Sequence, residues 1–219
     1  MNSFEKKYKG IYLLQDKVLA LLKGHFAGFY LTGGTALGRY YLNHRYSDDL
    51  DFFFNSSKVF EKEVQKVRDL LSNNYKMLTD DIILYEDFVR VWLEENRIKL
   101  KIEFVNDVSY RWGNAILVSG VCIDTPGNIL SNKLTALVNR EEPKDVYDII
   151  HLALNFSFHW DKIFYHSVKK AIVNEVDVAT KLKTFPVALF EDKDWLPDKV
   201  NYNFLQEKLD IITDDFLFA

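Results

Sequence analysis

The hydrophobic pattern of the chain changes character at Pro126. Before it, β-rich segments alternate with amphipathic helical ones at 4–24, 35–43 and 60–71. The strand candidates are residues 29–32, 50–54, 82–85, 88–92, 98–104 and 114–123, with a hairpin turn at Glu95-Asn96. After it, apolar residues recur at helical spacing over about 127–140, 143–156, 161–172 and 200–213. The pattern predicts an α/β domain over residues 1–125 and a helical domain over residues 126–219.

Composition limits the class of protein. The chain has 219 residues, of which 48% are apolar and 15% aromatic, so it can bury a substantial core and is not a disordered protein. Its single cysteine, Cys122, cannot form an internal disulfide. This excludes a secreted disulfide scaffold and a zinc ribbon, and we expect a cytoplasmic protein.

Charge and hydropathy argue against membranes and extended nucleic-acid surfaces. The charged start of the chain is unlike a signal peptide, and the longest nearly apolar run, 115–123, is about half of the roughly 20 residues that a spanning helix needs. We therefore expect no membrane association. The net charge is −4, and the acidic excess lies in residues 171–219, so a wide basic surface is not expected, although a local cluster can still hold phosphates.

Two carboxylates stand two positions apart at the start of a predicted strand. Side chains alternate along a strand, so Asp49 and Asp51 point the same way, roughly 7 Å apart. Their repulsion, on the order of 2 kcal/mol at an effective dielectric of about 20, calls for a compensating charge. Mg²⁺ or Mn²⁺ would supply it, and Glu103 on a later strand is the candidate third ligand. The alternative is a solvated acidic loop at a strand edge.

A glycine turn joins the first predicted strand to the following helix. Gly33 and Gly34 have no side chains, so their backbone N–H groups can approach phosphate oxygens near the positive end of the helix dipole. Thr35 adds a hydroxyl. The alternative is an ordinary helix start.

A third group of charges lies in the helical half. Lys133 and Arg140 are seven residues apart on a predicted helix, which puts them nearly on one face, within reach of a triphosphate. We expect Lys133 to contribute little to the core, and the alternative for the pair is a solvated helix face. Asp145 lies near the start of the next helix. Its alternative is an acid that is stabilised there by the helix dipole and has no further role.

Taken together, these segments resemble the AbiEii/AbiGii toxin family of nucleotidyltransferases. The resemblance rests on Leu31-Thr32-Gly33-Gly34-Thr35-Ala36-Leu37, His44 to Phe53, Lys133 to Arg140 and Lys144 to Asp148, and it covers about residues 28–155. It implies a mixed sheet flanked by helices, followed by a helical unit. Glu103 stands where Asp is usual, and 14 residues separate Gly34 from Asp49, more than in many members of the wider superfamily.

The resemblance also assigns roles to residues. It implies that the nucleotide is contacted by Gly33, Gly34, Thr35 and Ser47. It also implies that the metal is bound by Asp49 and Asp51, with Glu103 as the third carboxylate. Lys133 and Arg140 would meet the triphosphate, and Asp145 would be a further active-site residue.

The expected activity is metal-dependent transfer of a nucleoside monophosphate from an NTP to an acceptor, with release of pyrophosphate. The resemblance implies a toxin paired with an antitoxin, in abortive infection or phage defence, with an RNA such as tRNA as the acceptor for some relatives. Two alternatives stay open: a small-molecule nucleotidyltransferase of the aminoglycoside type, and a module that binds a nucleotide or protein partner without turnover.

Overall fold

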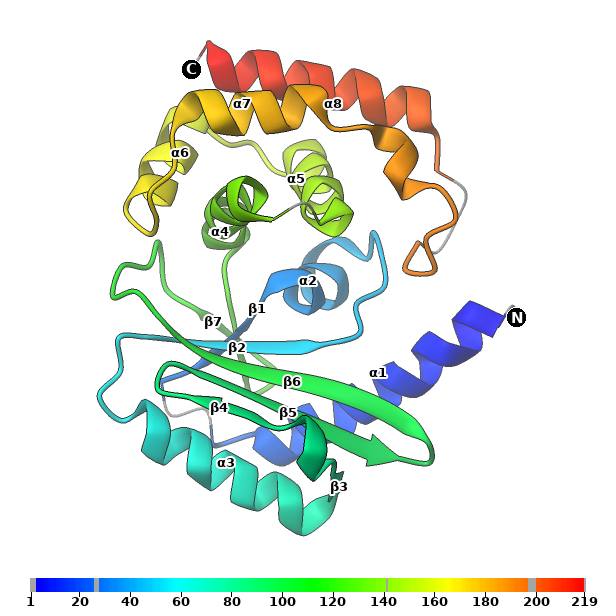
Figure 1. Cartoon of the computed structure of the whole chain (residues 1–219), viewed down its shortest axis with the longest axis vertical. Helices are drawn as coiled ribbons and strands as arrows, with labels where there is room; N and C mark the ends of the chain where they lie inside the picture. Colours follow the sequence, from blue (N-terminus) through cyan, green and yellow to red (C-terminus); the bar gives the residue numbers. More distant parts are fainter. Residues whose placement is uncertain (1–2, 26–27, 141, 197–199, 219) are drawn as a thin grey trace. The chain divides into compact units, whose positions relative to one another are not determined.

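The structure is a computed structural model that describes residues 3–25, 28–140, 142–196 and 200–218 (Figure 1). Its residues group into two compact units. We call the first the sheet unit; it comprises residues 1–36, 46–109 and 114–124. We call the second the helical unit; it comprises residues 37–45, 110–113 and 125–219. Two short segments that precede Pro126 in the chain thus group with the helices that follow it.

An eight-stranded mixed sheet forms the sheet unit, in the order β3-β5-β6-β2-β1-β8-β7, with β4 also paired to β5. Its strands are β1 (Tyr30–Thr32), β2 (Leu50–Asn55), β3 (Lys76–Met77), β4 (Ile83–Tyr85), β5 (Phe88–Glu95), β6 (Ile98–Asp107), β7 (Ile116–Val118) and β8 (Val121–Ile123). Strand β2 runs parallel to β6 and antiparallel to β1, while β8 runs parallel to β1. The predicted fold class, a mixed sheet with helices, is confirmed.

One face of this sheet is apolar and aromatic. Leu50, Phe52 and Phe54 alternate along β2 and are fully buried. The Phe52 ring stacks on Phe104 of β6 at 5.5 Å between centroids, and Phe54 meets Phe60 edge-on at 5.2 Å. Phe60 begins α3 (Phe60–Asn74), which lies with α1 (Ser3–Leu22) on this side of the sheet, whereas α2 (Gly33–Ala36) lies on the other side (Figure 1). Because side chains alternate, Asp51 projects toward the α2 side.

Two turns differ from the prediction. Residues 114–123 form a hairpin of β7 and β8 rather than one strand, because Ser119 and Gly120 both adopt positive φ, 51° and 86°, and reverse the chain. The β5–β6 hairpin turns at Asn96 and Arg97, with φ of 52° and 67°, one residue later than expected.

The helix expected over 35–43 begins at the glycine pair. It consists of the short α2 followed directly by a π-helical segment, η1 (Leu37–Leu42). Such segments are rare and often occur near functional sites.

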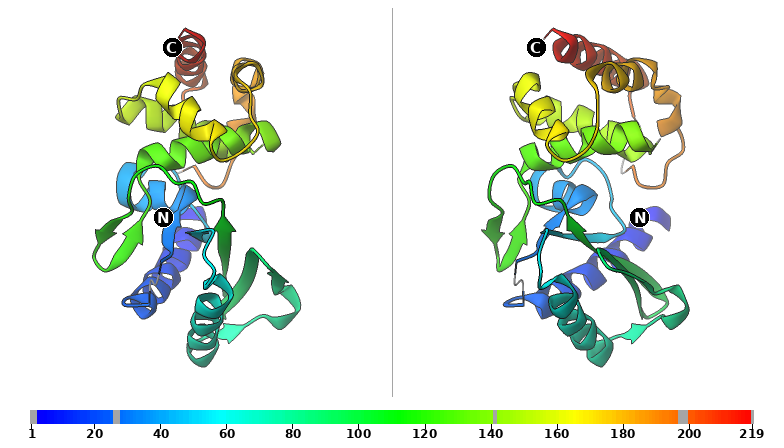
Figure 2. Two further views of the ribbon diagram at one scale, coloured as in Figure 1. Left: turned by 90° about the vertical axis from the view of Figure 1, so that its left-hand side faces the viewer. Right: turned by 60° about the vertical axis from the view of Figure 1, so that its left-hand side comes forward.

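The helical unit contains five α-helices in the part of the chain that is described, α4 (Pro126–Asn139), α5 (Pro143–Asn155), α6 (Trp160–Val168), α7 (Glu175–Thr184) and α8 (Tyr202–Leu217), and a 3₁₀ turn, η3 (Val187–Phe190) (Figure 2). Proline starts α4 and α5, where its missing N–H is not needed. Helix α7 was not predicted, because only three of its residues are apolar and buried. It is nevertheless capped at Asn174, whose side chain accepts a hydrogen bond from the Asp177 N–H. None of the described helices combines the length and apolar character needed to cross a membrane.

Candidate active site

A row of polar residues crosses the sheet on the α2 side. Thr32 of β1 is paired in register with Asp51 of β2, Asp51 with Glu103 of β6, and Glu103 with Arg90 of β5. Asp124 follows β8 and extends the row, since the Thr32 hydroxyl donates a 2.7 Å hydrogen bond to its carboxylate. Neighbouring strands in a sheet lie about 5 Å apart, so this register places Asp51 beside Glu103.

The glycine turn leaves room for the central carboxylate of this row, that of Asp51. Gly33 has φ of +68°, and a Cβ built on it would lie 2.9 Å from Asp51 Oδ2. A residue with a side chain would be strained at this φ and would also displace the Asp51 carboxylate. The turn is therefore shaped to bring backbone against Asp51, which an ordinary helix start does not require.

Hydrogen bonds to main-chain groups hold the segment before Asp51. The fully buried Thr35 hydroxyl donates to the carbonyl oxygen of Asp49. From α1, the buried Gln15 amide donates to the carbonyl oxygens of Ser47, at 3.1 Å, and Asp49, at 3.3 Å. The Ser47 N–H donates to the Tyr12 hydroxyl. These contacts set the backbone from which the Asp49 side chain projects.

Two cations of the sheet itself compensate the acidic side chains. Lys101 Nζ lies 3.0 Å from Asp49 Oδ2 and 3.4 Å from Glu103 Oε1, and Arg90 lies 2.6 Å from the same Glu103 oxygen. Burial raises the pKa of Asp49, and the neighbouring Asp48 and Glu103 add to this against the opposing effect of Lys101. Asp49 and Glu103 are thus paired with cations of the sheet, and the alternative of a merely solvated acidic loop does not describe them.

The donor chemistry here fits a hard cation at Asp49 and Asp51. Asp49 keeps 32% of its side chain exposed, and carboxylate oxygens are the ligands that Mg²⁺ and Mn²⁺ prefer. Lys101 engages both Asp49 and Glu103, but Glu103 differs in that its carboxylate also binds Arg90. Within the described ranges, no three His, Cys, Asp or Glu side chains converge in a metal-binding arrangement.

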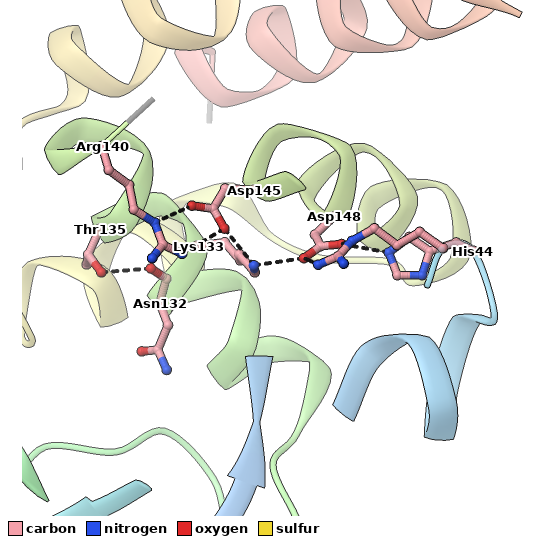
Figure 3. A network of polar contacts seen from close by, with 8 residues as sticks. His44, Asn132, Lys133, Thr135, Arg140, Asp145 and Asp148 are labelled. Carbon is pink, nitrogen blue, oxygen red and sulfur yellow. Dashed lines mark hydrogen bonds and ion pairs between the residues drawn. The ribbon is translucent and has the colours of Figure 1, made fainter. Parts of the chain in front are cut away.

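In the helical unit, a chain of ion pairs joins α4, α5 and the segment before Tyr46 (Figure 3). Arg140 donates hydrogen bonds to both oxygens of Asp145, from Nε at 2.7 Å and from a terminal nitrogen at 3.1 Å. Lys133 Nζ bridges Asp145, at 2.6 Å, and Asp148, at 2.7 Å. Arg45 binds both oxygens of Asp148, at 2.6 and 2.7 Å. We call these residues, together with His44, the α4–α5 ion network.

Almost all of this network is buried. The side chain of Lys133 is 9% exposed, that of Asp145 2%, and that of Asp148 is fully buried. The expectation that Lys133 contributes little to the core, and its alternative of a solvated face, are therefore wrong for Lys133. Arg140 differs, with 57% of its side chain exposed. It follows α4 in an extended conformation, which lets it turn back to Asp145.

The network keeps its charges. Burial would raise the pKa of Asp148, but Arg45 and Lys133 hold it well below its usual value. Burial would lower the pKa of Lys133, but Asp148 and Asp145 raise it. His44 is neutral near pH 7, because burial lowers its pKa against the effect of Asp148. Its Nε2–H donates to Asp148 at 2.7 Å. Three cations face two carboxylates, so the network carries one positive charge in excess.

The predicted site residues thus form two groups. In the sheet unit, Asp51 lies beside Glu103 and leaves no room for a side chain at Gly33, which Gly34 follows in α2. Thr35 binds the Asp49 carbonyl oxygen, and Gln15 binds those of Ser47 and Asp49, in the segment that leads into β2. The helical unit brings together Lys133, Arg140 and Asp145.

Sequence reasoning gave no role to several residues that complete these groups, namely His44, Arg45, Arg90, Lys101, Asp124 and Asp148. A signal existed for Asp148, which lies three residues after Asp145 and so on the same helix face. Arg90 and Lys101 carried no such signal, because their partners depend on the pairing of strands.

Comparison with known proteins gives the family of the chain. The sequence profile described as "Nucleotidyl transferase AbiEii toxin, Type IV TA system" matches residues 17–215. An uncharacterized protein of Aquifex aeolicus (strain VF5) is 30% identical over 182 residues, covering 81% of this chain and 80% of that protein.

Two solved structures share the fold. JHP933 from Helicobacter pylori has a TM-score of 0.62 at 20% identity, covering 96% of this chain and 92% of its own. MenT4, a nucleotidyltransferase toxin from Mycobacterium tuberculosis H37Rv, has a TM-score of 0.70 at 14% identity, covering 99% and 85%. The profile match spans most of the chain, including both groups of site residues. The chain therefore belongs to the AbiEii family of nucleotidyltransferase toxins of toxin–antitoxin systems.

Proposed function

We propose that this enzyme transfers a nucleoside monophosphate from an NTP to an acceptor hydroxyl in a reaction that depends on Mg²⁺ or Mn²⁺. The observation that carries the proposal is that the Asp51 carboxylate, in register with Glu103, occupies the space that a side chain at position 33 would need. A bend that excludes a side chain can admit phosphate oxygens to backbone N–H groups, next to carboxylates that suit a divalent cation.

The sheet unit would hold the reacting end of the nucleotide. Asp49 and Asp51 are the proposed metal ligands, and a bound divalent cation would neutralise charge on the phosphates. We keep Glu103 as the third carboxylate, with the added role of anchoring Arg90 and Lys101. Backbone N–H groups at Gly33 and Gly34 would bind phosphate oxygens. Thr35 would act through Asp49, whose carbonyl oxygen accepts its hydroxyl hydrogen.

The helical unit would supply positive charge for the triphosphate. Arg140 is the proposed direct contact, because its side chain is more than half exposed while Asp145 orients its guanidinium. Lys133 would add to the positive potential while holding Asp145 and Asp148 in place.

The transfer balances without another co-reactant. The acceptor oxygen attacks the α-phosphorus, the bond between the α- and β-phosphates breaks, and pyrophosphate leaves with the electron pair of that bond. The proton of the acceptor hydroxyl passes to a carboxylate, Asp51 or Glu103. Lys133 and Arg140 would stabilise charge on the leaving pyrophosphate.

For the biological setting, we propose an RNA such as tRNA as the acceptor, an antitoxin as protein partner, and a role in abortive infection or phage defence. The support is membership of the toxin family. We also propose a cytoplasmic location, in keeping with a chain whose single cysteine, Cys122, needs no oxidising compartment.

The test is incubation with each α-labelled NTP, Mg²⁺, total RNA and a panel of small acceptors. Label on RNA supports the proposal. Label on a small molecule contradicts the RNA acceptor and favours an enzyme of the aminoglycoside type. Tight NTP binding with neither label transfer nor pyrophosphate release contradicts the transfer reaction.

A further inference from the structure

An open cavity of about 470 Å³ lies beside Arg140 in the helical unit. Its walls come from the end of α4, the start of α5, the last turns of α7 and the segment around η3. Cavities of roughly 300 to 1,000 Å³ are typical of small-molecule sites. The cavity is therefore large enough for a ligand of the size of a nucleotide.

Apolar and aromatic side chains form one side of this cavity. It is lined there by Val146, Phe185 and Leu189. The Phe185 ring packs against the Phe190 ring, with 5.2 Å between their centroids. Leu189 is 43% exposed, so its side chain is accessible to a ligand in the cavity. This wall suits a flat ring, because a planar ligand gains most contact against an apolar surface.

Charged and hydroxyl groups form the other side. Of the described residues that line the cavity, Arg140 and Lys181 are basic and Glu142 is acidic. Arg140 also belongs to the α4–α5 ion network, which carries one positive charge in excess even with Asp145 bound to it, so the charge here favours an anion. Thr180 and Thr184 add hydroxyl groups that can accept or donate hydrogen bonds. A nucleoside phosphate has the three groups that these walls would bind, namely a flat ring, hydroxyl groups and an anion.

The cavity is also connected to the α4–α5 ion network. Arg140 binds both oxygens of Asp145 and lines the cavity, and Asp145 in turn binds Lys133. An anion at Arg140 would therefore act on the same residues that we assign to the triphosphate. We propose that this cavity binds a nucleoside phosphate, either the nucleoside end of the NTP or a nucleotide of the acceptor. The proposal rests on the proposed function for the choice of ligand.

The test uses calorimetry in EDTA to measure the affinity of wild type and variants for AMP, GMP, CMP and UMP in the absence of metal. Lys181→Glu reverses a charge in the cavity, and Leu189→Trp fills the cavity without changing charge. Lys183→Glu is the matched control, because Lys183 lies two residues further along α7, is exposed and does not line the cavity. Thermal melts of all four proteins establish that the variants are folded.

We expect wild type to bind at least one monophosphate, and Lys181→Glu and Leu189→Trp each to weaken that binding by about tenfold or more, because a charge-assisted contact or the ring site is lost. Lys183→Glu should stay within about twofold of wild type. Equal binding by all four proteins would overturn the proposal. So would equal affinity for inorganic phosphate and for the monophosphates, since the ring would then have no role.

The two sources of the nucleoside are separated by kinetics. A higher KM for NTP in both cavity variants, with an unchanged KM for the acceptor, identifies the NTP, and the reverse identifies the acceptor. Monophosphate binding in EDTA needs no turnover. A wild type that binds monophosphate but transfers no label would therefore refute the proposed function alone, and one that transfers label but binds no monophosphate would refute the cavity alone.

Discussion

At the scale of single residues, Lys101 has the most direct influence on the candidate metal ligands. It lies 3.0 Å from Asp49 and 3.4 Å from Glu103, and its side chain is 21% exposed. These acids raise the pKa of Lys101 against the opposing effect of burial, so it is a cation at neutral pH. It provides part of the compensation that the spacing of Asp49 and Asp51 requires.

We predict that Lys101→Met lowers the free energy of unfolding in EDTA by about 1 to 2 kcal/mol, because the carboxylates then repel one another without a counter-charge. Added Mg²⁺ should restore more stability to this variant than to wild type. Urea unfolding with EDTA and with Mg²⁺ measures both. Lys99→Met is the control, since Lys99 is exposed on the same strand. A Lys101→Met protein as stable in EDTA as the control would show that Lys101 does not neutralise the acids.

Lys133 and Arg140 both bind Asp145 but differ in burial, so their loss should have different effects. Lys133→Met should lower the free energy of unfolding by about 3 kcal/mol or more, because the buried Asp145 and Asp148 lose a shared counter-ion. Arg140→Met should cost about 1 kcal/mol or less, since this side chain is 57% exposed, yet weaken NTP binding by about tenfold. Chemical denaturation and calorimetry report the two quantities. The reverse ranking for stability would contradict the assignment.

At the scale of elements, the junction of β1 and α2 depends on a glycine that cannot be replaced without moving Asp51. Gly33→Ala should lose about 1 to 2 kcal/mol of stability from its positive φ, and transfer activity should fall because Asp51 must shift. Gly24→Ala is a matched control. Gly24 has φ of +80° and nothing within 4 Å of its added Cβ, so it carries the backbone cost alone.

Activity and melting of the two alanine variants test this role of the junction. Similar destabilisation with activity lost only at Gly33 is the expected result. Equal activity in both variants would mean that the space left for Asp51 at Gly33 has no part in the reaction.

Elements were predictable where the signal is local. The strand–glycine–helix order at 30–42 and the apolar alternation of β2 follow from the period of the residues. The hairpin at Ser119-Gly120 was missed because a positive φ at Ser119 is not encoded by any apolar pattern. Helix α7 was missed for a related reason, since Val178, Ala179 and Leu182 supply too narrow an apolar face.

At the scale of the whole molecule, the limit is long-range pairing. The register that sets Asp51 beside Glu103 joins residues 52 positions apart, and the contact of Arg45 with Asp148 spans 103 positions. No local pattern specifies either. The motifs indicated which residue types matter, but partners such as Lys101, Arg45 and Asp124 depend on how the chain folds back on itself.

Burial of a histidine in the helical unit makes the stability of the protein depend on pH. Burial, with a smaller effect of His44, lowers the pKa of His151 to about 4, while an unfolded histidine titrates near 6.5. Between these values the unfolded chain binds more protons, so the free energy of unfolding falls as the pH falls from 7 to 4. This one group accounts for a loss on the order of 3 kcal/mol.

We predict that His151→Phe flattens this part of the pH–stability curve, because the ring contact with Tyr147 remains but the titrating group is gone. His159→Phe, at an exposed histidine of the same unit, is the control. Urea unfolding at pH 7, 5.5 and 4 gives the slopes. A His151→Phe slope equal to that of wild type would show that His151 is not held neutral by burial.

The polar row across the sheet, with Asp51 at its centre, is assigned to metal-dependent nucleotidyl transfer, and the substitution Asp51→Asn probes this assignment. The measurement is pyrophosphate release and label transfer from an α-labelled NTP with Mg²⁺ or with EDTA, alongside Asp69→Asn, which removes an exposed carboxylate on α3. We expect that Asp69→Asn matches wild type, that EDTA abolishes transfer, and that Asp51→Asn slows transfer by about a hundredfold or more while remaining folded. Transfer by Asp51→Asn at the wild-type rate, or wild-type transfer that persists in EDTA, would contradict this assignment.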